Sequence, residues 1–154
     1  MALKPDRYEF QTEISYFCNS VTERGVVLIH SSSGSGAALD QTAAVVTLAG
    51  TGVTVGMKPA GLLLNDMVAN DRTKSFTNVY KDEMYVGGKC TLLRKGWVVT
   101  NMIAPAITPV AGDIAYLAPS GKITNSATGT PPAIGTFLSA KSELGYAKVE
   151  INLP

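Results

Sequence analysis

Short apolar runs separated by turn residues fill the C-terminal third of this chain. The runs are short enough for strands, and they occupy residues 112–117, 123–125, 133–138 and 146–153. A Pro-Ser-Gly-Lys turn and a loop rich in Gly and Pro separate them. Side chains that could act as nucleophiles, acids or bases are almost absent from these residues. This pattern is typical of a protein that keeps a shape and binds a partner.

The same spacing of apolar runs and turns continues through the middle of the chain. Six of the eight prolines lie at or beyond Pro105, which rules out long helices there. We therefore predict an all-β protein with one small β-barrel or sandwich domain. Further predicted strands are 26–29, 43–48, 53–55, 61–64, 90–93 and 97–103.

Two connections in this middle region are also predicted. Arg94-Lys95-Gly96 lies between the last two of these strands and is typical of a hairpin turn. Residues 66–88 are the most polar stretch of the chain, which indicates a long loop with, at most, a short helical turn.

Residues 1–25 form a distinct N-terminal segment. Four of the ten Tyr and Phe residues of the chain lie here, and the apolar side chains alternate in part with a period of two. We predict an extended N-terminal arm over 1–25, followed by a β-barrel-like domain over 26–154. The arm would fold back on its own core or lie on a neighbouring subunit. The alternative is that these residues form the first strand of the domain.

Composition favours an assembly component and argues against several other classes. Charged residues make up 16% of the chain, against about 25% in an average protein. The formal net charge of +1 offers no field that would attract nucleic acid.

The first ten residues do not follow a signal-peptide pattern, and no apolar run approaches the 18 residues of a membrane span. We expect a soluble protein that is made in a cytoplasm and contacts neither nucleic acid nor membrane.

No catalytic arrangement is evident from the residue spacing. His30 is the only histidine; it precedes Ser31 and lies near Asp40, but no strained nucleophile turn surrounds it. We predict an imidazole at the end of a strand or in a loop. Gly87-Gly88-Lys89-Cys90 lacks the preceding Gly and the following Ser or Thr of a phosphate-binding loop. We expect no enzymatic activity and no catalytic residue.

Metal and cofactor sites are not predicted either. Cys18, Cys90 and the one histidine are too few and too scattered for zinc. We expect two buried free thiols, with a disulfide as the alternative. The oxygen ligands of Asp66, Asn70 and Asp71 lack the spacing of a calcium loop, so a solvated loop is expected there. Trp97 is predicted to be a core residue.

The C-terminal block resembles a known family in the order of its motifs. Pro109-Val-Ala-Gly-Asp-Ile-Ala-Tyr-Leu117 is followed by Ser120-Gly-Lys-Ile-Thr-Asn125, then by Pro132-Ala-Ile-Gly-Thr-Phe-Leu138 and Ala147-Lys-Val-Glu-Ile151. This order resembles the small capsid decoration, or cement, proteins of tailed bacteriophages, which have a β-tulip or barrel fold. The likeness covers about residues 105–154.

The resemblance implies a structural role without a cofactor. Such proteins sit on the outer face of the mature capsid, usually as homotrimers and sometimes as dimers. They clamp neighbouring subunits of the major capsid protein against the pressure of the packaged DNA. The implied location is the outer capsid surface of a virion.

Within that role we expect the N-terminal arm to contact the capsid or a neighbouring subunit, because an extended arm can add a strand to another sheet. The candidate contact residues are Tyr8, Phe10, Ile14, Tyr16 and Phe17. Three alternatives remain open. They are a tail-associated or receptor-binding β domain of a virion, a small-ligand-binding β-barrel, and an enzyme.

Overall fold

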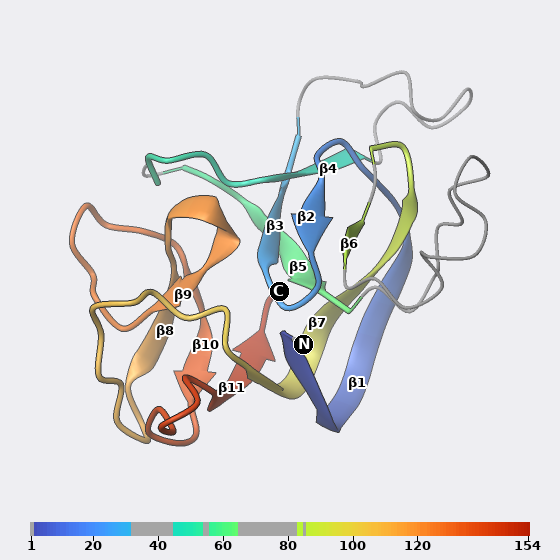
Figure 1. The fold of residues 1–154 in the computed structure, drawn as a ribbon. Helices are drawn as coiled ribbons and strands as arrows, with labels where there is room; N and C mark the ends of the chain where they lie inside the picture. Colours follow the sequence, from blue (N-terminus) through green and yellow to red (C-terminus); the bar gives the residue numbers. More distant parts are fainter. Residues whose placement is uncertain (1, 32–44, 54–55, 65–82, 85) are drawn as a thin grey trace.

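The computed structural model describes residues 2–31, 45–53, 56–64, 83–84 and 86–154. These residues confirm the all-β prediction. They form a nine-stranded sheet and a two-stranded sheet, and their only helical element is the 3-10 turn η1 at Pro119–Gly121 (Figure 1). The strands are β1 (Leu3–Cys18), β2 (Thr22–Glu23), β3 (Val27–His30), β4 (Val45–Leu48), β5 (Pro59–Leu63), β6 (Glu83–Met84), β7 (Lys89–Thr100), β8 (Ile114–Leu117), β9 (Ile123–Thr124), β10 (Ala133–Phe137) and β11 (Ala147–Asn152).

Five of these strands close into a ring. β1 pairs with β4, β4 with β3, β3 with β5, β5 with β7, and β7 with β1 again. On the edge of β7 that faces away from β1, the sheet continues through β11, β10, β8 and β9. The C-terminal strands therefore form a lobe beside the ring, and β7 belongs to both (Figure 1).

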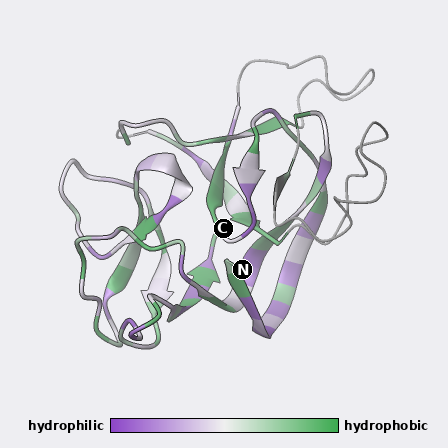
Figure 2. Ribbon diagram, in the orientation of Figure 1, coloured by the Kyte–Doolittle hydropathy of each residue, from purple (hydrophilic) through white to green (hydrophobic). Residues whose placement is uncertain are grey.

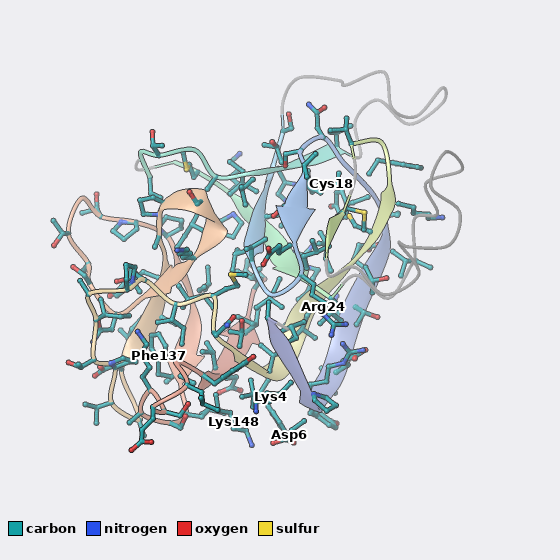
Figure 3. The ribbon with its side chains drawn as sticks, in the orientation of Figure 1. Lys4, Asp6, Cys18, Arg24, Phe137 and Lys148 are labelled. Atoms are coloured by element: carbon teal, nitrogen blue, oxygen red, sulfur yellow. The ribbon has the colours of Figure 1, made fainter. Side chains whose placement is uncertain are left out.

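Two hydrophobic cores correspond to these two parts. The smaller core lies among the ring strands and includes Cys18, Leu63 and Cys90. The larger core joins the C-terminal strands to the other face of β3 and β5, and it includes Leu62 and the fully buried Phe137 (Figure 3). Successive residues of a strand point to opposite faces, so an uninterrupted apolar run such as Leu62–Leu64 supplies both cores.

The residues predicted as two strands with a hairpin at Arg94–Gly96 instead form the single strand β7, so that prediction is wrong. β1 runs antiparallel beside β7 from Leu3 opposite Thr100 to Phe17 opposite Lys89, and the chain never reverses. Gly96 serves a different purpose. Its φ is +144°, and a Cβ at this position would collide with the carbonyl oxygen of Tyr8. The glycine permits a close approach of two strands and not a turn.

The C-terminal strands match the predicted runs. β8 and β9 pair antiparallel across η1, where Ser120 has a φ of 58°. β10 lies between β8 and β11. Gly135 on β10 allows a close backbone approach, because a Cβ there would collide with the carbonyl oxygen of Glu150.

The predicted polar loop at 66–88 lies mostly outside the described residues, as do the calcium candidates Asp66, Asn70 and Asp71. Within that range, Glu83–Met84 form β6, which pairs with β2. Gly87 donates its N–H to the carbonyl oxygen of Cys18, which joins the start of β7 to the end of β1.

The glycine at the centre of β10 gives a test of this packing. We expect Gly135→Ala to lower the free energy of unfolding by about 3 kcal/mol, because backbone on the neighbouring strand must move. Gly50→Ala is the matched control: no atom lies within 4 Å of a Cβ at that position, and a change of no more than about 0.5 kcal/mol is expected. Urea denaturation measures both, and equal midpoints would contradict the packing described here.

Candidate functional site

β1 is the most exposed strand of the described structure. It pairs with β7 along almost its whole length, but β4 covers its other edge only at Phe17 and Cys18. Between Lys4 and Ser15 every residue is exposed except Arg7 and Glu13, which are half-buried. Both faces of the strand are therefore in contact with solvent over this stretch. Figure 2 shows hydrophilic and hydrophobic bands in succession along it.

The five predicted contact residues divide into two groups. Tyr8, Phe10 and Ile14 are exposed, with exposed fractions of 55%, 72% and 55%. Tyr16 is half-buried; it packs against the smaller core and makes an edge-to-face contact with His30, with ring centroids 5.4 Å apart. Phe17 is also half-buried and lies between Val45 and Lys89 of the neighbouring strands. The first group is available to a partner, and the second anchors β1 to the ring.

A bulge explains the orientation of Phe10. Glu9 lies opposite Gly96 and Gln11 lies opposite Lys95, so Phe10 is an extra residue without an opposite partner on β7. Such an extra residue is left out of the hydrogen-bond ladder and bends the strand. This arrangement leaves the Phe10 ring largely in solvent.

Tyr8 and Phe10 border a groove of about 380 Å³ on the outer face of the sheet. Its other lining residues come from β7 and β11, and they are Lys95, Gly96, Trp97, Glu150, Ile151 and Asn152. Tyr8 lies opposite Trp97, which in turn lies opposite Glu150. The groove therefore combines aromatic rings with side chains of both charges.

Trp97 is not the core residue predicted from the sequence. The neighbouring Val98 enters the larger core, so alternation along β7 directs Trp97 to the outer surface, where it is half-buried. The Lys148 ammonium lies 3.4 Å from the centroid of its ring, a cation–π contact (Lys148 is marked in Figure 3). The sequence reasoning missed this site because it placed a hairpin where β7 is continuous.

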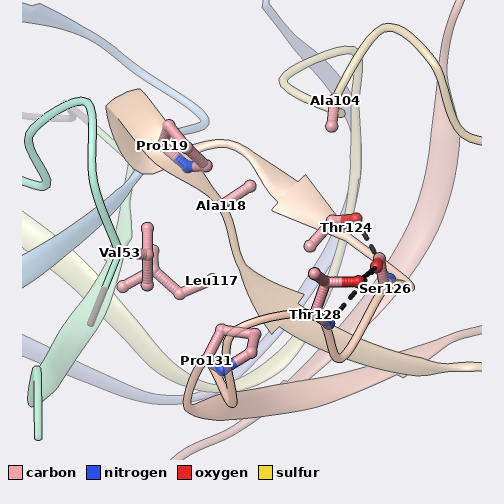
Figure 4. A pocket seen from close by; sticks show the side chains of 9 residues that line it. All are labelled: Val53, Ala104, Leu117, Ala118, Pro119, Thr124, Ser126, Thr128 and Pro131. Atoms are coloured by element: carbon pink, nitrogen blue, oxygen red, sulfur yellow. Dashed lines mark hydrogen bonds between the residues drawn. The ribbon is translucent and has the colours of Figure 1, made fainter. Parts of the chain in front are cut away.

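A second hollow, of about 240 Å³, lies beside η1 (Figure 4). It is lined by Val53, Ala104, Leu117, Ala118, Pro119, Thr124, Ser126, Thr128 and Pro131, none of which titrates. Three hydroxyl groups in its wall are engaged locally: Thr124 accepts the N–H of Ser126, and the Ser126 and Thr128 hydroxyls lie 2.9 Å apart. Its lining contains no acid or base that could activate these hydroxyls.

Within the C-terminal motif, the side chain of Asp113 connects two turns. The Asp113 carboxylate accepts hydrogen bonds from the N–H of Val110 and from the side-chain amide of Asn125, each at 2.9 Å. These bonds lower the pKa of Asp113, the backbone bond contributing most. Gly112 precedes it with a φ of 98°, a conformation that favours glycine. Asp113 thus joins the turn before β8 to the end of β9.

Three further side chains considered in the sequence, His30, Cys18 and Cys90, are either buried or close to cationic side chains. His30 ends β3 as predicted, and burial together with Arg94 and Lys58 lowers its pKa. Cys18 and Cys90 are free and buried, which confirms that prediction (Cys18 is labelled in Figure 3). Burial, followed by the proximity of Cys18, raises the pKa of Cys90 to about 12. Among the described residues, no three His, Cys, Asp or Glu side chains gather as a metal site.

The thiols give a prediction that native protein checks directly. At pH 8 we expect neither Cys18 nor Cys90 to react with a thiol reagent such as DTNB, because both are buried and mainly protonated. In denaturant both should react at once. Rapid reaction of either thiol in the folded protein would contradict the described packing of β1 on β7.

The Asp113 contacts give a pH-dependent prediction. The depressed pKa means that ionised Asp113 favours the folded state above the ordinary carboxyl range of about 4, and that this contribution is lost as the pH falls through the lower folded value. Carboxyl NMR titration should show Asp113 below the ordinary value. Asn125→Ala should raise its pKa only in part, since the Val110 bond remains. An unchanged pKa in that variant would contradict the role of Asn125.

In the part of the chain that the structure describes, no helix is long and apolar enough to cross a membrane. Comparison of the chain with protein-family models and with curated proteins gave no match.

Proposed function

We propose that this protein is a structural virion component that binds the outer surface of a mature bacteriophage capsid and cements neighbouring major capsid protein subunits. It would also associate with itself, as a homotrimer or a dimer. The observation that carries the proposal is β1, a long strand that exposes Tyr8, Phe10 and Ile14 to solvent. Large apolar side chains gathered on an exposed strand are typical of interaction surfaces.

The arrangement of the remaining strands supports the same role. The C-terminal block, whose motif order resembles decoration proteins, forms strands β8 to β11, and Asp113 and Asn125 of that motif bond to each other. β7 pairs with β1 along one edge and with β5 and β11 along the other. It therefore gives β1 a rigid support. A rigid strand loses little conformational entropy when a partner covers it.

The mechanism would be additive. Each copy would bury a modest area against two or more capsid subunits, and many copies would together resist outward strain. A protein that binds only the mature lattice stabilises that lattice through mass action. Neither bond chemistry nor a cofactor is required for this effect.

The test is co-sedimentation with mature capsids that lack the protein, followed by counting of bound copies. We expect saturation at hundreds of copies per particle and a higher capsid melting temperature. Because residues 1–20 include the whole of β1, their deletion would damage the fold, so point variants are preferable. Ile14→Ser should bind about tenfold more weakly, a loss of about 1.4 kcal/mol. Leu144→Ser, at a 75% exposed position away from β1, should bind as the parent does.

Other outcomes would overturn the proposal. Saturation at a handful of sites would favour a tail-associated or receptor-binding domain. No binding at all would remove the capsid role. Equal weakening by Ile14→Ser and Leu144→Ser would show that β1 is not the contacting element.

A further inference from the structure

We propose that the groove on the outer face of β1, β7 and β11 binds a neutral glycan, with one sugar ring stacked on the side chains of Tyr8 and Trp97. This role goes beyond the proposed capsid function. The two proposals share Tyr8 and Phe10, but they are tested at different residues, because Ile14 does not line the groove. Either proposal can therefore fail while the other holds.

The groove lies between two rows of side chains that cross the strands. Tyr8 lies opposite Trp97, and Trp97 lies opposite Glu150, which together form the first row. Lys95 lies opposite Asn152 and forms the second row. Residues two apart on a strand are about 6.6 Å apart and share a face. One side of the groove is therefore mainly aromatic, and the other carries an ammonium and an amide.

The floor between the two rows is backbone. The lining residues there are Gly96, which has no side chain, and Ile151, whose side chain is buried in the larger core. These two residues lie opposite each other on β7 and β11. The absence of an outward side chain between the rows leaves the hollow open to a flat ligand.

Lys148 holds the Trp97 ring from the side away from the groove. Its ammonium lies 3.4 Å from the ring centroid, a cation–π contact. Lys148 lies opposite Val99, on the side of Trp97 away from Lys95, and it does not line the groove. One face of the ring is thus occupied, and the other borders the groove. An aromatic ring fixed in this way loses little freedom when a ligand stacks on it.

A sugar presents both kinds of surface that this lining complements. One side of a pyranose ring carries C–H groups, which pack on aromatic rings, and its rim carries hydroxyls that donate and accept hydrogen bonds. The Glu150 carboxylate accepts, the Lys95 ammonium donates, and the Asn152 amide does both. Aromatic walls with a few polar groups are typical of small-ligand sites. The opposite charges of Lys95 and Glu150 cancel, which favours a neutral glycan.

Other classes of ligand meet an obstacle in this groove. A quaternary ammonium would be repelled by Lys95 in the lining and by Lys148 behind the Trp97 ring. A nucleic acid would place phosphates near the Glu150 carboxylate, and the net charge of +1 gives no attraction to a polyanion. An extended peptide adds to a free strand edge, whereas the groove lies on the face of three strands that pair with each other.

The experiment uses the fluorescence of Trp97, the only tryptophan of the chain. The free protein is titrated with the methyl glycosides of glucose, galactose, mannose and N-acetylglucosamine, and with maltotriose, cellotriose and chitotriose. We expect a saturable blue shift of the emission with at least one of these sugars, because a stacked sugar ring displaces water from the indole.

Variants of the lining separate recognition from folding. Tyr8→Ala removes an exposed ring, and Glu150→Gln replaces a carboxylate by an amide of the same shape, so each should weaken sugar binding at least tenfold. Leu144→Ser and Ile14→Ser lie at exposed positions outside the groove and should bind the sugar as the parent does. Ile14→Ser should thus weaken only capsid binding. Circular dichroism verifies that each variant is folded.

Three results would overturn the glycan site. The first is the absence of a saturable response to every sugar of the panel. The second is equal sugar affinity in the parent, Tyr8→Ala and Glu150→Gln. The third comes from titration with tetramethylammonium and with oligothymidylate, since tighter binding of either than of the sugars would assign the groove to that class. None of these measurements requires a capsid.

Discussion

The pairing of β7 on both of its edges is the constraint on which the rest of the structure depends. One edge pairs with β1, and the other pairs first with β5 and then with β11. Leu92 enters the smaller core while Leu93 enters the larger one, so a single strand holds two cores together. If β7 ended at Arg94, the ring and the C-terminal lobe would lose their shared strand.

This arrangement separates stability from recognition. The two cores lie around β3, β5, β7 and the C-terminal strands, whereas β1 between Lys4 and Ser15 contributes little to either. That part of β1 depends mainly on its backbone ladder with β7 and on its anchors at both ends, Leu3 in the larger core and Cys18 in the smaller. The strand can therefore carry exposed aromatic residues without loss of core packing.

The sequence alone determined the features that depend on neighbouring residues, and the tertiary structure decided those that depend on residues far apart in the chain. Local turn chemistry and alternation sufficed for the all-β class and for the strands β8 to β11, where Gly112 and Pro119 act on their immediate neighbours. The aromatic character of the N-terminal segment was also evident. Only the tertiary structure decided that Arg94–Gly96 continues a strand, because Gly96 packs closely against the backbone of Tyr8, which is far away in the sequence. It likewise decided that Trp97 faces outward and that Tyr16 is an anchor, since pairing partners set which face each residue occupies.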